Sequence, residues 1–275
     1  MNENLLEVKN LTKEFLVEKN FKTRILNALG KKEPEKILAI DDVSFNLRKG
    51  EILGVLGESG SGKSTLAKIL MGIYKADKGQ LLYNGKDITT GKRSLSLLRE
   101  MQMIFQDPYS SLNPRMTVKQ IISEPLRIHG LYSKKDSQPF LVDALEEVGL
   151  QEDVLNKYPA EFSGGQRQRI CICRSMILNP SLIIADEAVS ALDVSVQAQI
   201  LELLVELKSK RGLSMIFISH DVAVVRQIAD RVLVFQKGQL KSKINPEDLV
   251  RAHGDEYTRK LIESAIYLRE GKRFD

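Results

Sequence analysis

One stretch of the sequence combines the residue types and the spacing that bind a phosphate group. An apolar run at 52–56 precedes it, and apolar residues at helical spacing follow it at 66–70. Three glycines let the backbone between them curl, so that several N–H groups point at one anion. A helix expected to begin at about Lys63 adds the positive end of its dipole. The stretch comprises Gly57, Glu58, Ser59, Gly60, Ser61, Gly62, Lys63, Ser64 and Thr65.

Two side chains in this stretch favour a nucleoside triphosphate over a simple anion. Lys63 can reach the outer phosphates of the nucleotide, and the Ser64 hydroxyl can ligate magnesium. The alternative is a glycine-rich turn without a binding role. The complete G-x-x-x-x-G-K-S spacing between a strand and a helix argues against it. The sequence therefore predicts a site for a nucleoside triphosphate with Mg²⁺.

A second pair of residues follows the aliphatic run at 182–185. Such a run is typical of a central parallel strand buried on both faces, and open α/β sheets bind ligands at the carboxyl ends of their strands. Asp186 there can hold magnesium through a water, and Glu187 can orient and polarise the attacking water. Adjacent carboxylates are more often a solvated strand end. The phosphate-binding stretch upstream favours the functional interpretation.

The segment at 161–169 narrows the class of protein. It reads Glu-Phe-Ser-Gly-Gly-Gln-Arg-Gln-Arg and resembles the signature of ABC-type ATPases, which usually carry leucine where this chain has Phe162. Ser163 is a favourable N-cap, and the two glycines after it expose backbone N–H groups at a helix start. A chance Ser-Gly-Gly turn is the alternative, and the order of the motifs disfavours it. The predicted binding residues are Ser163, Gly164, Gly165 and Gln166.

The resemblance implies how these two glycine-rich turns work together. In ABC-type ATPases, the signature of one subunit caps the nucleotide that the phosphate loop of another subunit holds. The nucleotide is then expected to be ATP, enclosed in a head-to-tail pair of ATPase domains. This chain contains one such domain, so its mate is expected to be a second chain.

Four further positions match the family one by one. Gln106 resembles the Q-loop glutamine, which contacts magnesium and the attacking water, and it adjoins the expected helical insert. Asp193 ends a Ser-Ala-Leu-Asp segment that resembles the D-loop, which links the two active sites. His220 resembles the switch histidine at the γ-phosphate, although a lone histidine is more often structural. Phe15 stands where the family stacks an aromatic ring on adenine; a core phenylalanine is the alternative.

Three segments resemble one branch of the family, the importers of peptides and nickel. They are 106–115, 190–198 and, loosened by an insertion, 253–258. Ala188 stands where peptide importers usually carry proline and some nickel importers carry alanine. The resemblance implies an ATP-hydrolysing subunit that energises an importer of oligopeptides or dipeptides. Nickel or a metallophore is the alternative cargo.

The branch also implies the partners. We expect a second ATPase subunit, a paralogue rather than an identical copy, and two transmembrane permease subunits. An extracytoplasmic substrate-binding protein is expected through the complex, and nucleic acid is not. The chain is then peripheral at the cytoplasmic face of the cell membrane. A nucleic-acid-associated ATPase of the same superfamily and a non-hydrolysing regulatory subunit are the rival interpretations.

Composition agrees with an ordinary globular protein. Of 275 residues, 43% are hydrophobic and 28% charged, and the net charge of +5 gives nucleic-acid binding little support. No apolar run approaches the ~20 residues that cross a bilayer. Cys171 and Cys173 are expected on one helix, where residues two apart point in different directions, so we interpret them as small core side chains.

The elements that must position these residues alternate between strand and helix, which indicates a mostly parallel sheet. The fold class is α/β: a P-loop NTPase of the ABC type with a RecA-like sheet, an N-terminal antiparallel β subdomain and a helical insert. We predict one domain over 1–275. Its ATP-binding core spans about 1–106 and 165–236, its helical subdomain about 107–164, and its tail about 237–275. An exposed excursion is expected at 18–35.

Overall fold

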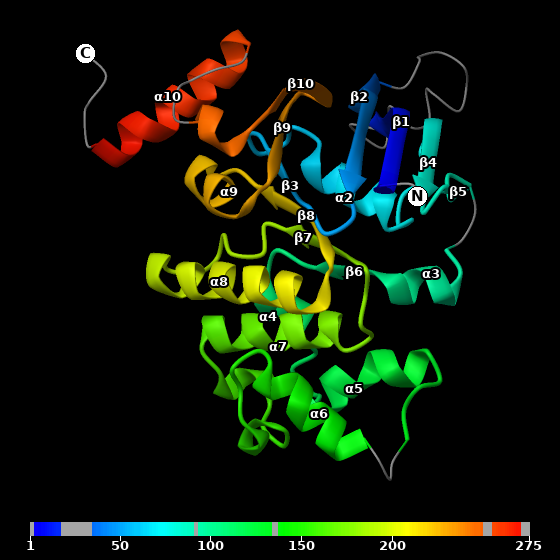
Figure 1. Cartoon of the computed structure of the whole chain (residues 1–275), viewed down its shortest axis with the longest axis vertical. Helices are drawn as coiled ribbons and strands as arrows, with labels where there is room; N and C mark the ends of the chain where they lie inside the picture. Colours follow the sequence, from blue (N-terminus) through cyan, green and yellow to red (C-terminus); the bar gives the residue numbers. More distant parts are fainter. Residues whose placement is uncertain (1–2, 18–34, 91–92, 134–136, 250–254, 271–275) are drawn as a thin grey trace, which may run out of the picture.

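The structure is a computed structural model that describes residues 3–17, 35–90, 93–133, 137–249 and 255–270. Within these residues, the strands form a six-stranded and a four-stranded sheet (Figure 1). The six-stranded sheet has the order β10-β9-β3-β8-β7-β6. Its strands are β3 (Ile52–Leu56), β6 (Met101–Ile104), β7 (Leu182–Asp186), β8 (Ser214–Ser219), β9 (Arg231–Gln236) and β10 (Gln239–Ile244).

The six-stranded sheet is parallel except at one edge, where β10 runs antiparallel to β9. Every residue of β3, β7 and β8 is buried. Continuous aliphatic runs are typical of strands covered on both faces, so the prediction of a mostly parallel, buried sheet is confirmed. In this register Asp186 lies opposite Ile218, which brings the carboxyl ends of β7 and β8 together.

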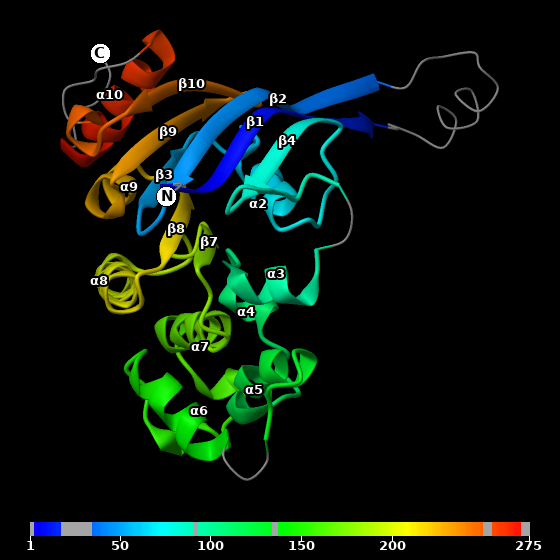
Figure 2. The ribbon, with the colours of Figure 1, turned by 45° about the vertical axis from the view of Figure 1, so that its right-hand side comes forward.

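The four-stranded sheet is antiparallel and has the order β2-β1-β4-β5. Its strands are β1 (Asn4–Val17), β2 (Glu35–Arg48), β4 (Lys78–Tyr83) and β5 (Lys86–Asp87). The sequence pattern predicts a strand only at 5–10, so β1 extends well beyond the predicted strand. The far ends of β1 and β2 project from the body of the molecule (Figure 2), and Leu16 and Ile37 there are more than half exposed. Without a buried face, this part of β1 carries no apolar alternation to predict it.

Two hydrophobic cores lie on opposite faces of the six-stranded sheet, as the alternation along β3 shows. Leu53 and Val55 pack in a core with α2 (Lys63–Leu70) and the antiparallel sheet. Ile52 and Leu56 point into a second core, which most of the other helices build. Chief among these are α7 (Gly164–Met176), α8 (Val194–Arg211) and α9 (Val222–Ile228).

The two cysteines of α7 are buried in the second core, which agrees with the prediction. Burial raises the pKa of the Cys171 thiol to about 11 and that of Cys173 to about 12. A thiol with so high a pKa stays protonated at neutral pH and is a poor nucleophile. The two side chains therefore act as small apolar groups.

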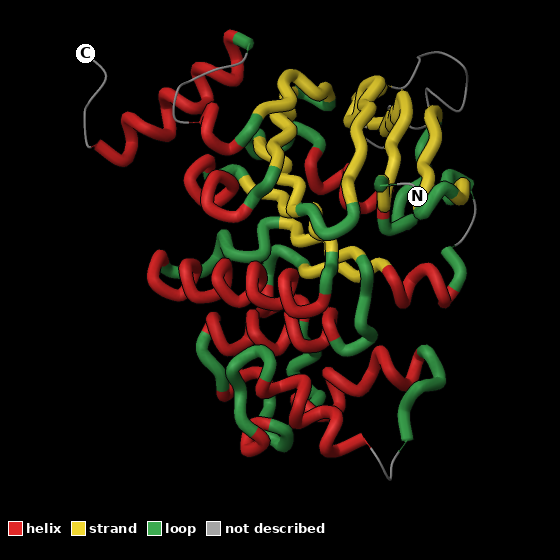
Figure 3. The backbone as a smooth tube through the Cα atoms, in the orientation of Figure 1, coloured by secondary structure: helices red, strands yellow, loops and turns green. Residues whose placement is uncertain are grey.

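A layer of helices follows β6, in the lower half of Figure 3. The apolar periodicity of the sequence predicts helices at 118–128 and 139–148. They correspond to α5 (Val118–Ile128) and α6 (Ser137–Glu146). The short helices α3 (Leu95–Glu100) and α4 (Pro108–Ser111) were not predicted. The helix α3 has only six residues and none of them is buried, so its leucines form too short a pattern to indicate a helix. Two 3₁₀ turns, Glu152–Val154 and Pro159–Glu161, lead into α7.

The last elements are the β9–β10 hairpin, a 3₁₀ turn at Pro246–Leu249 and α10 (Glu256–Glu270). The sequence pattern predicts a helix at 246–251, and the described part of that segment is instead a 3₁₀ turn. Most of the excursion predicted at 18–35, and residues 253 and 254 of the tail element, lie outside the described residues. Among the helices that are described, none has the length and apolarity to span a bilayer.

Candidate nucleotide-binding site

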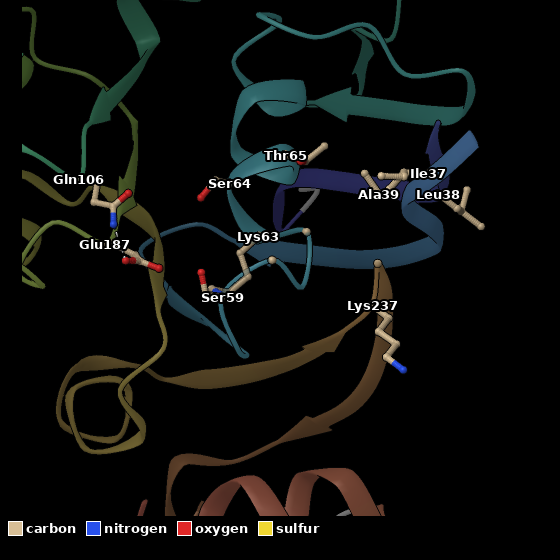
Figure 4. Close-up of a pocket in the computed structure, with 13 residues that line it drawn as sticks. Ile37, Leu38, Ala39, Ser59, Lys63, Ser64, Thr65, Gln106, Glu187 and Lys237 are labelled. Atoms are coloured by element: carbon tan, nitrogen blue, oxygen red, sulfur yellow. Dashed lines mark hydrogen bonds between the residues drawn. The ribbon is translucent and has the colours of Figure 1, made fainter. Parts of the chain in front are cut away.

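A cavity of about 410 Å³ lies beside the amino end of α2 (Figure 4). The predicted phosphate loop forms one wall, and Gln106 and Glu187 lie across from it. The loop, Gln106 and Glu187 therefore share one cavity, although they are far apart in the sequence. The lining residues are Ile37, Leu38, Ala39, Ser59, Gly60, Gly62, Lys63, Ser64, Thr65, Gln106, Glu187, Lys237 and Gly238.

At two positions of the loop, close packing requires a glycine, in addition to the turn of the backbone. Gly62 has a φ of +107°, and a Cβ there would lie 2.4 Å from the carbonyl oxygen of Ala39. A Cβ on Gly57 would lie 2.4 Å from the carbonyl oxygen of Phe235. The loop is therefore enclosed between β2 and the end of β9. No larger residue fits at either position without a backbone shift.

Lys63 is buried at the centre of the loop. Its Nζ donates to the carbonyl oxygens of Gly57 at 2.7 Å and Glu58 at 2.8 Å. Burial lowers the pKa of the ammonium group, while the charges of Glu187, Asp186 and Glu58 oppose that shift. The partners of the ammonium group are neutral carbonyls. A phosphate oxygen can take their place, because it forms a stronger, charge-assisted hydrogen bond with the ammonium group.

Ser64 and Asp186 meet although 122 residues separate them. The Ser64 hydroxyl donates to Oδ1 of Asp186 at 3.0 Å, which joins the first turn of α2 to the end of β7. Burial raises the pKa of the Asp186 carboxyl, and the nearby Glu187 charge adds to this, while the Ser64 hydrogen bond acts against it. Two oxygens so placed fit Mg²⁺, which takes oxygen ligands and keeps waters and phosphates in its other positions.

Glu187 occupies an unusual backbone conformation at the end of β7. Its φ is +49°, in the left-handed region that non-glycine residues rarely adopt, and its N–H donates to the carbonyl of Ile218 at 3.0 Å. The carboxylate lies between two partners. Oε2 accepts from Nε2 of Gln106 at 2.8 Å, and Oε1 lies 3.4 Å from Nδ1 of His220. The ends of three adjacent strands therefore place Gln106, Glu187 and His220 in contact.

The signature turn lies elsewhere, since none of its residues is among those lining the cavity. Ser163 caps α7 in a reciprocal pair: its hydroxyl accepts from the N–H of Gln166 at 3.4 Å, and Oε1 of Gln166 accepts from the N–H of Ser163 at 3.1 Å. A Cβ on Gly164 would meet nothing closer than 3.5 Å. A Cβ on Gly165 would lie 2.5 Å from Cγ1 of Val196, so that glycine is needed for the packing of α7 on α8.

Asp193 also lies outside the cavity lining and caps α8. Its Oδ1 accepts from the N–H of Val196 at 3.0 Å and from the Ser195 hydroxyl at 2.8 Å, and these bonds lower the pKa of the carboxyl. The preceding Leu192 approaches Gly164. The predicted D-loop and signature are therefore neighbours, away from the phosphate loop.

Phe15 does not line the cavity either. Its ring packs edge-on against Tyr74, with centroids 5.2 Å apart, and Nζ of Lys13 lies 5.2 Å from its centroid. In the sheet register Phe15 is the partner of Ile37, a residue that does line the cavity. Phe15 therefore lies beside a residue of the cavity lining, and its contact with adenine stays a prediction.

Sequence reasoning missed two parts of the cavity, the β2 residues and the turn between β9 and β10. Lys237 and Gly238 form this turn, both with positive φ. The N–H of Gly238 donates to the carbonyl of Ser61 at 2.9 Å, and its own carbonyl accepts from Asp41 at 2.9 Å. The turn dipeptide was visible in the sequence, but its contact with the loop depends on β9 lying beside β3.

A glycine-rich loop between a buried strand and a helix, a buried lysine inside it, and a serine–aspartate pair at its mouth define the P-loop class of nucleoside triphosphatases. A dimeric structure of the ATP-binding cassette MJ0796 bound to ADP and Pi has the same fold. It superposes with a TM-score of 0.73 at 26% identity, over 88% of this chain and 98% of that one.

Sequence comparison identifies the family within that class. Residues 40–190 match the family model described as ABC transporter. The chain is 47% identical to the probable peptide ABC transporter ATP-binding protein y4tS of Sinorhizobium fredii, over 96% of this chain and 73% of that protein. It is 44% identical to the oligopeptide transport ATP-binding protein OppF of Bacillus subtilis, over 98% of this chain and 84% of that protein. The chain belongs to the ABC transporter family and is an ATP-binding, ATP-hydrolysing member of it.

Proposed function

We propose that this chain is the ATPase subunit that powers an importer of oligopeptides or dipeptides. The observation that carries the proposal is the Glu187 carboxylate, held between Gln106 and His220 beside the Ser64–Asp186 pair. This is the arrangement of a site that hydrolyses ATP rather than one that only binds it. The peptide cargo is supported by the names of y4tS and OppF.

The phosphate-loop residues bind and orient the nucleotide in this proposal. Lys63 exchanges its bonds to the Gly57 and Glu58 carbonyls for the outer phosphates of ATP, and the loop N–H groups surround the same oxygens. Ser64 and Asp186 would hold Mg²⁺, and Gln106, which lines the same cavity as Ser64, would contribute a further oxygen. Bound Mg²⁺ supplies positive charge to the phosphate oxygens during phosphoryl transfer.

Glu187 orients the attacking water in the same proposal. Its carboxylate oxygens accept hydrogen bonds, so a water at this position points its lone pair away from Glu187 and toward the γ-phosphate. The amide of Gln106 and the imidazole of His220 fix the carboxylate in place. We also propose that His220, whose Nδ1 lies 3.4 Å from the Glu187 carboxylate, contacts the γ-phosphate when ATP is bound.

The signature turn completes the site from a second subunit. Ser163, Gly164 and their N–H groups are outside the cavity of their own chain, yet they form an open, capped helix start suited to an anion. We infer a head-to-tail pair in which each signature caps the ATP of the mate, with Asp193 near the contact. The mate is proposed to be a paralogue.

The transport partners follow from the same proposal: two permease subunits, a substrate-binding protein reached through them, and no nucleic acid. A groove between β6 and the helical layer supports the permease contact, because the exposed Phe105 lines it together with Ser110 and Arg174. The chain then lies at the cytoplasmic face of the membrane. Ala188, the position that hinted at nickel, is buried in the core and cannot contact a cargo.

Transport by the reconstituted complex tests the proposal. The chain, its mate, the permeases and the binding protein are placed in vesicles with a labelled peptide or with Ni²⁺. We expect ATP-dependent peptide uptake that fails when Glu187→Gln replaces the parent chain. Uptake of Ni²⁺ without peptide uptake would contradict the cargo, and co-purification of nucleic acid in place of permeases would contradict the transport role.

A further inference from the structure

The short helix after Gln106 is bonded to the signature helix at two places. Arg174 of α7 donates from Nη1 to the carbonyl of Ser111 at 2.6 Å. Two turns earlier on the same helix, the Arg167 guanidinium lies over the ring of Tyr109, 4.2 Å from its centroid. Arginines seven residues apart on α7 therefore hold both ends of α4 (Pro108–Ser111).

Arg167 also bonds to the turn that carries Ser163. Its Nε donates to the carbonyl of Phe162 at 3.0 Å, and its Nη2 donates to the carbonyl of Ala160 at 3.4 Å. Phe162 directly precedes Ser163, so these bonds fix the direction from which the chain enters the α7 cap. A guanidinium suits this task because its donors lie in a rigid plane whose face remains free to stack.

Tyr109 is rigidly connected to Gln106. Asp107 caps α4, and its Oδ1 accepts from the N–H of Tyr109 at 2.9 Å. Gln106 is the residue before that cap, and its amide bonds to Glu187. Although Tyr109 is 58% exposed, it does not line the groove that Ser110 and Ser111 line. Its ring instead faces Arg167 and the signature turn.

We infer that Arg167 is a positioning residue that acts through the ring of Tyr109, and that this stack holds the Ser163 turn in a fixed place relative to Gln106. The signature offered to the mate's ATP and the glutamine of the chain's own site then move together. The inference rests on the proposed head-to-tail pair, because only there does the position of Ser163 affect hydrolysis.

The stack has a specific consequence for kinetics. ATP binding by the single chain depends on the phosphate loop, which the stack does not contact, so its affinity stays unchanged when the stack is removed. Turnover in the assembled pair depends on the signature reaching the mate's ATP. Loss of the stack is therefore expected to lower kcat while KM for ATP changes little.

The test uses the assembled transporter with variants of Tyr109 and Arg167. Tyr109→Leu is expected to lower kcat about fivefold, with KM for ATP changed by less than about twofold. Tyr109→Phe keeps the ring and is expected to restore kcat to within about twofold of the parent. We expect Arg167→Gln to lower kcat less in the Tyr109→Leu background than in the parent, because the two residues act as a unit.

A second stack in the same chain supplies a matched control. Arg127 of α5 lies 4.7 Å from the ring centroid of Tyr132, a pair that includes no residue of α4 or of the signature turn. Tyr132→Leu removes a pair of the same kind and is expected to leave kcat near that of the parent. If Tyr109→Leu, Tyr109→Phe and Tyr132→Leu all give the same kcat, the inference is wrong. Ser163→Arg separates this outcome from failure of the head-to-tail pair, because it must still reduce turnover if that pair exists.

Discussion

The phosphate loop and the signature turn are both glycine-rich helix starts, yet their surroundings differ. Gly57 and Gly62 of the phosphate loop press against backbone carbonyls, and Lys63 is buried beneath them. At the signature turn, a Cβ on Gly164 would make only ordinary van der Waals contacts, the nearest at 3.5 Å, and the Ser163 cap is exposed. A chain encloses one anion site by itself and leaves the other open. The open site is suited to a ligand that another molecule brings.

The largest expected effect is on turnover, and it comes from Glu187, which lines the cavity beside the enclosed phosphate loop. Glu187→Gln removes the charge that polarises the attacking water but keeps the shape of the side chain. We expect turnover to fall about a hundredfold or more while ATP affinity is retained. Phosphate release by the assembled complex measures the first quantity, and calorimetry measures the second. Turnover close to the parent's would show that another group activates the water.

The next effect separates the two halves directly. Lys63→Ala is expected to lower the ATP affinity of the single chain about tenfold or more, because the outer phosphates lose their buried cation. Ser163→Arg is expected to leave that affinity unchanged and to reduce turnover of the pair by a similar factor. Calorimetry on the chain alone and ATPase assays on the complex make the comparison. A loss of single-chain affinity in Ser163→Arg would place the signature in its own chain's site.

Replacing one glycine in each turn is expected to have a smaller effect, on the free energy of unfolding. Gly62→Ala forces a Cβ into the Ala39 carbonyl at a positive φ, and we expect it to destabilise the fold by about 2 kcal/mol or more. In Gly164→Ala the new Cβ would make only ordinary van der Waals contacts, the nearest with Leu192 at 3.5 Å, so we expect stability to change by less than about 0.5 kcal/mol. Urea unfolding measures both variants. Equal destabilisation would remove the contrast between an enclosed and an open turn.

The smallest expected effects concern the pH dependence of stability. They involve one acid beside the phosphate loop, Asp186, and one beside the signature turn, Asp193. The folded-state pKa of Asp186 is raised by burial, so the stability linked to it is complete below its unfolded value of 3.8 and is lost as pH rises through the folded pKa. Asp186→Asn should therefore melt above the parent at neutral pH, and the difference should vanish in acid. Parallel melts at about pH 7 and about pH 3.5 test this.

Asp193 behaves in the opposite way. Its folded pKa is lowered by the hydrogen bonds from Val196 and Ser195, so its stabilisation is present above 3.8 and is lost as pH falls through the folded pKa. Asp193→Ala should melt below the parent at neutral pH, with a smaller difference in acid. Two variants that shift the melting temperature in the same direction at neutral pH would contradict the assigned environments.

Much of this arrangement could be predicted from the sequence, because local signals carried it. The runs around Ile52 and Leu182 gave buried strands, and the motif spacing predicted that Lys63, Asp186 and Glu187 share one site. The β2 wall of the cavity and the Gly238 turn could not be predicted, since both depend on which strands become neighbours. Nor does any local signal reveal the positive φ of Glu187, which tertiary contacts impose.

The placement of Phe15 shows the same limit. A motif position predicts contact with adenine, but the pairing of Phe15 with Ile37, a residue that lines the cavity, depends on the register of β1 on β2. Contact between Phe15 and adenine therefore stays a prediction. Similarly, the sequence explained Gly165 as a means of exposing an N–H, whereas the structure shows a contact with Val196 that requires a glycine. A motif therefore shows which residues are required, but it does not always show the physical reason for the requirement.

The most direct test of the central claim is a structure of the assembled complex that carries Glu187→Gln and has ATP bound. The account predicts that each ATP lies on the Lys63 loop of one subunit, with the Ser163 hydroxyl and the Gly164 N–H of its mate within hydrogen-bond distance of the γ-phosphate. A trapped complex in which Ser163 lies far from every bound triphosphate would contradict it.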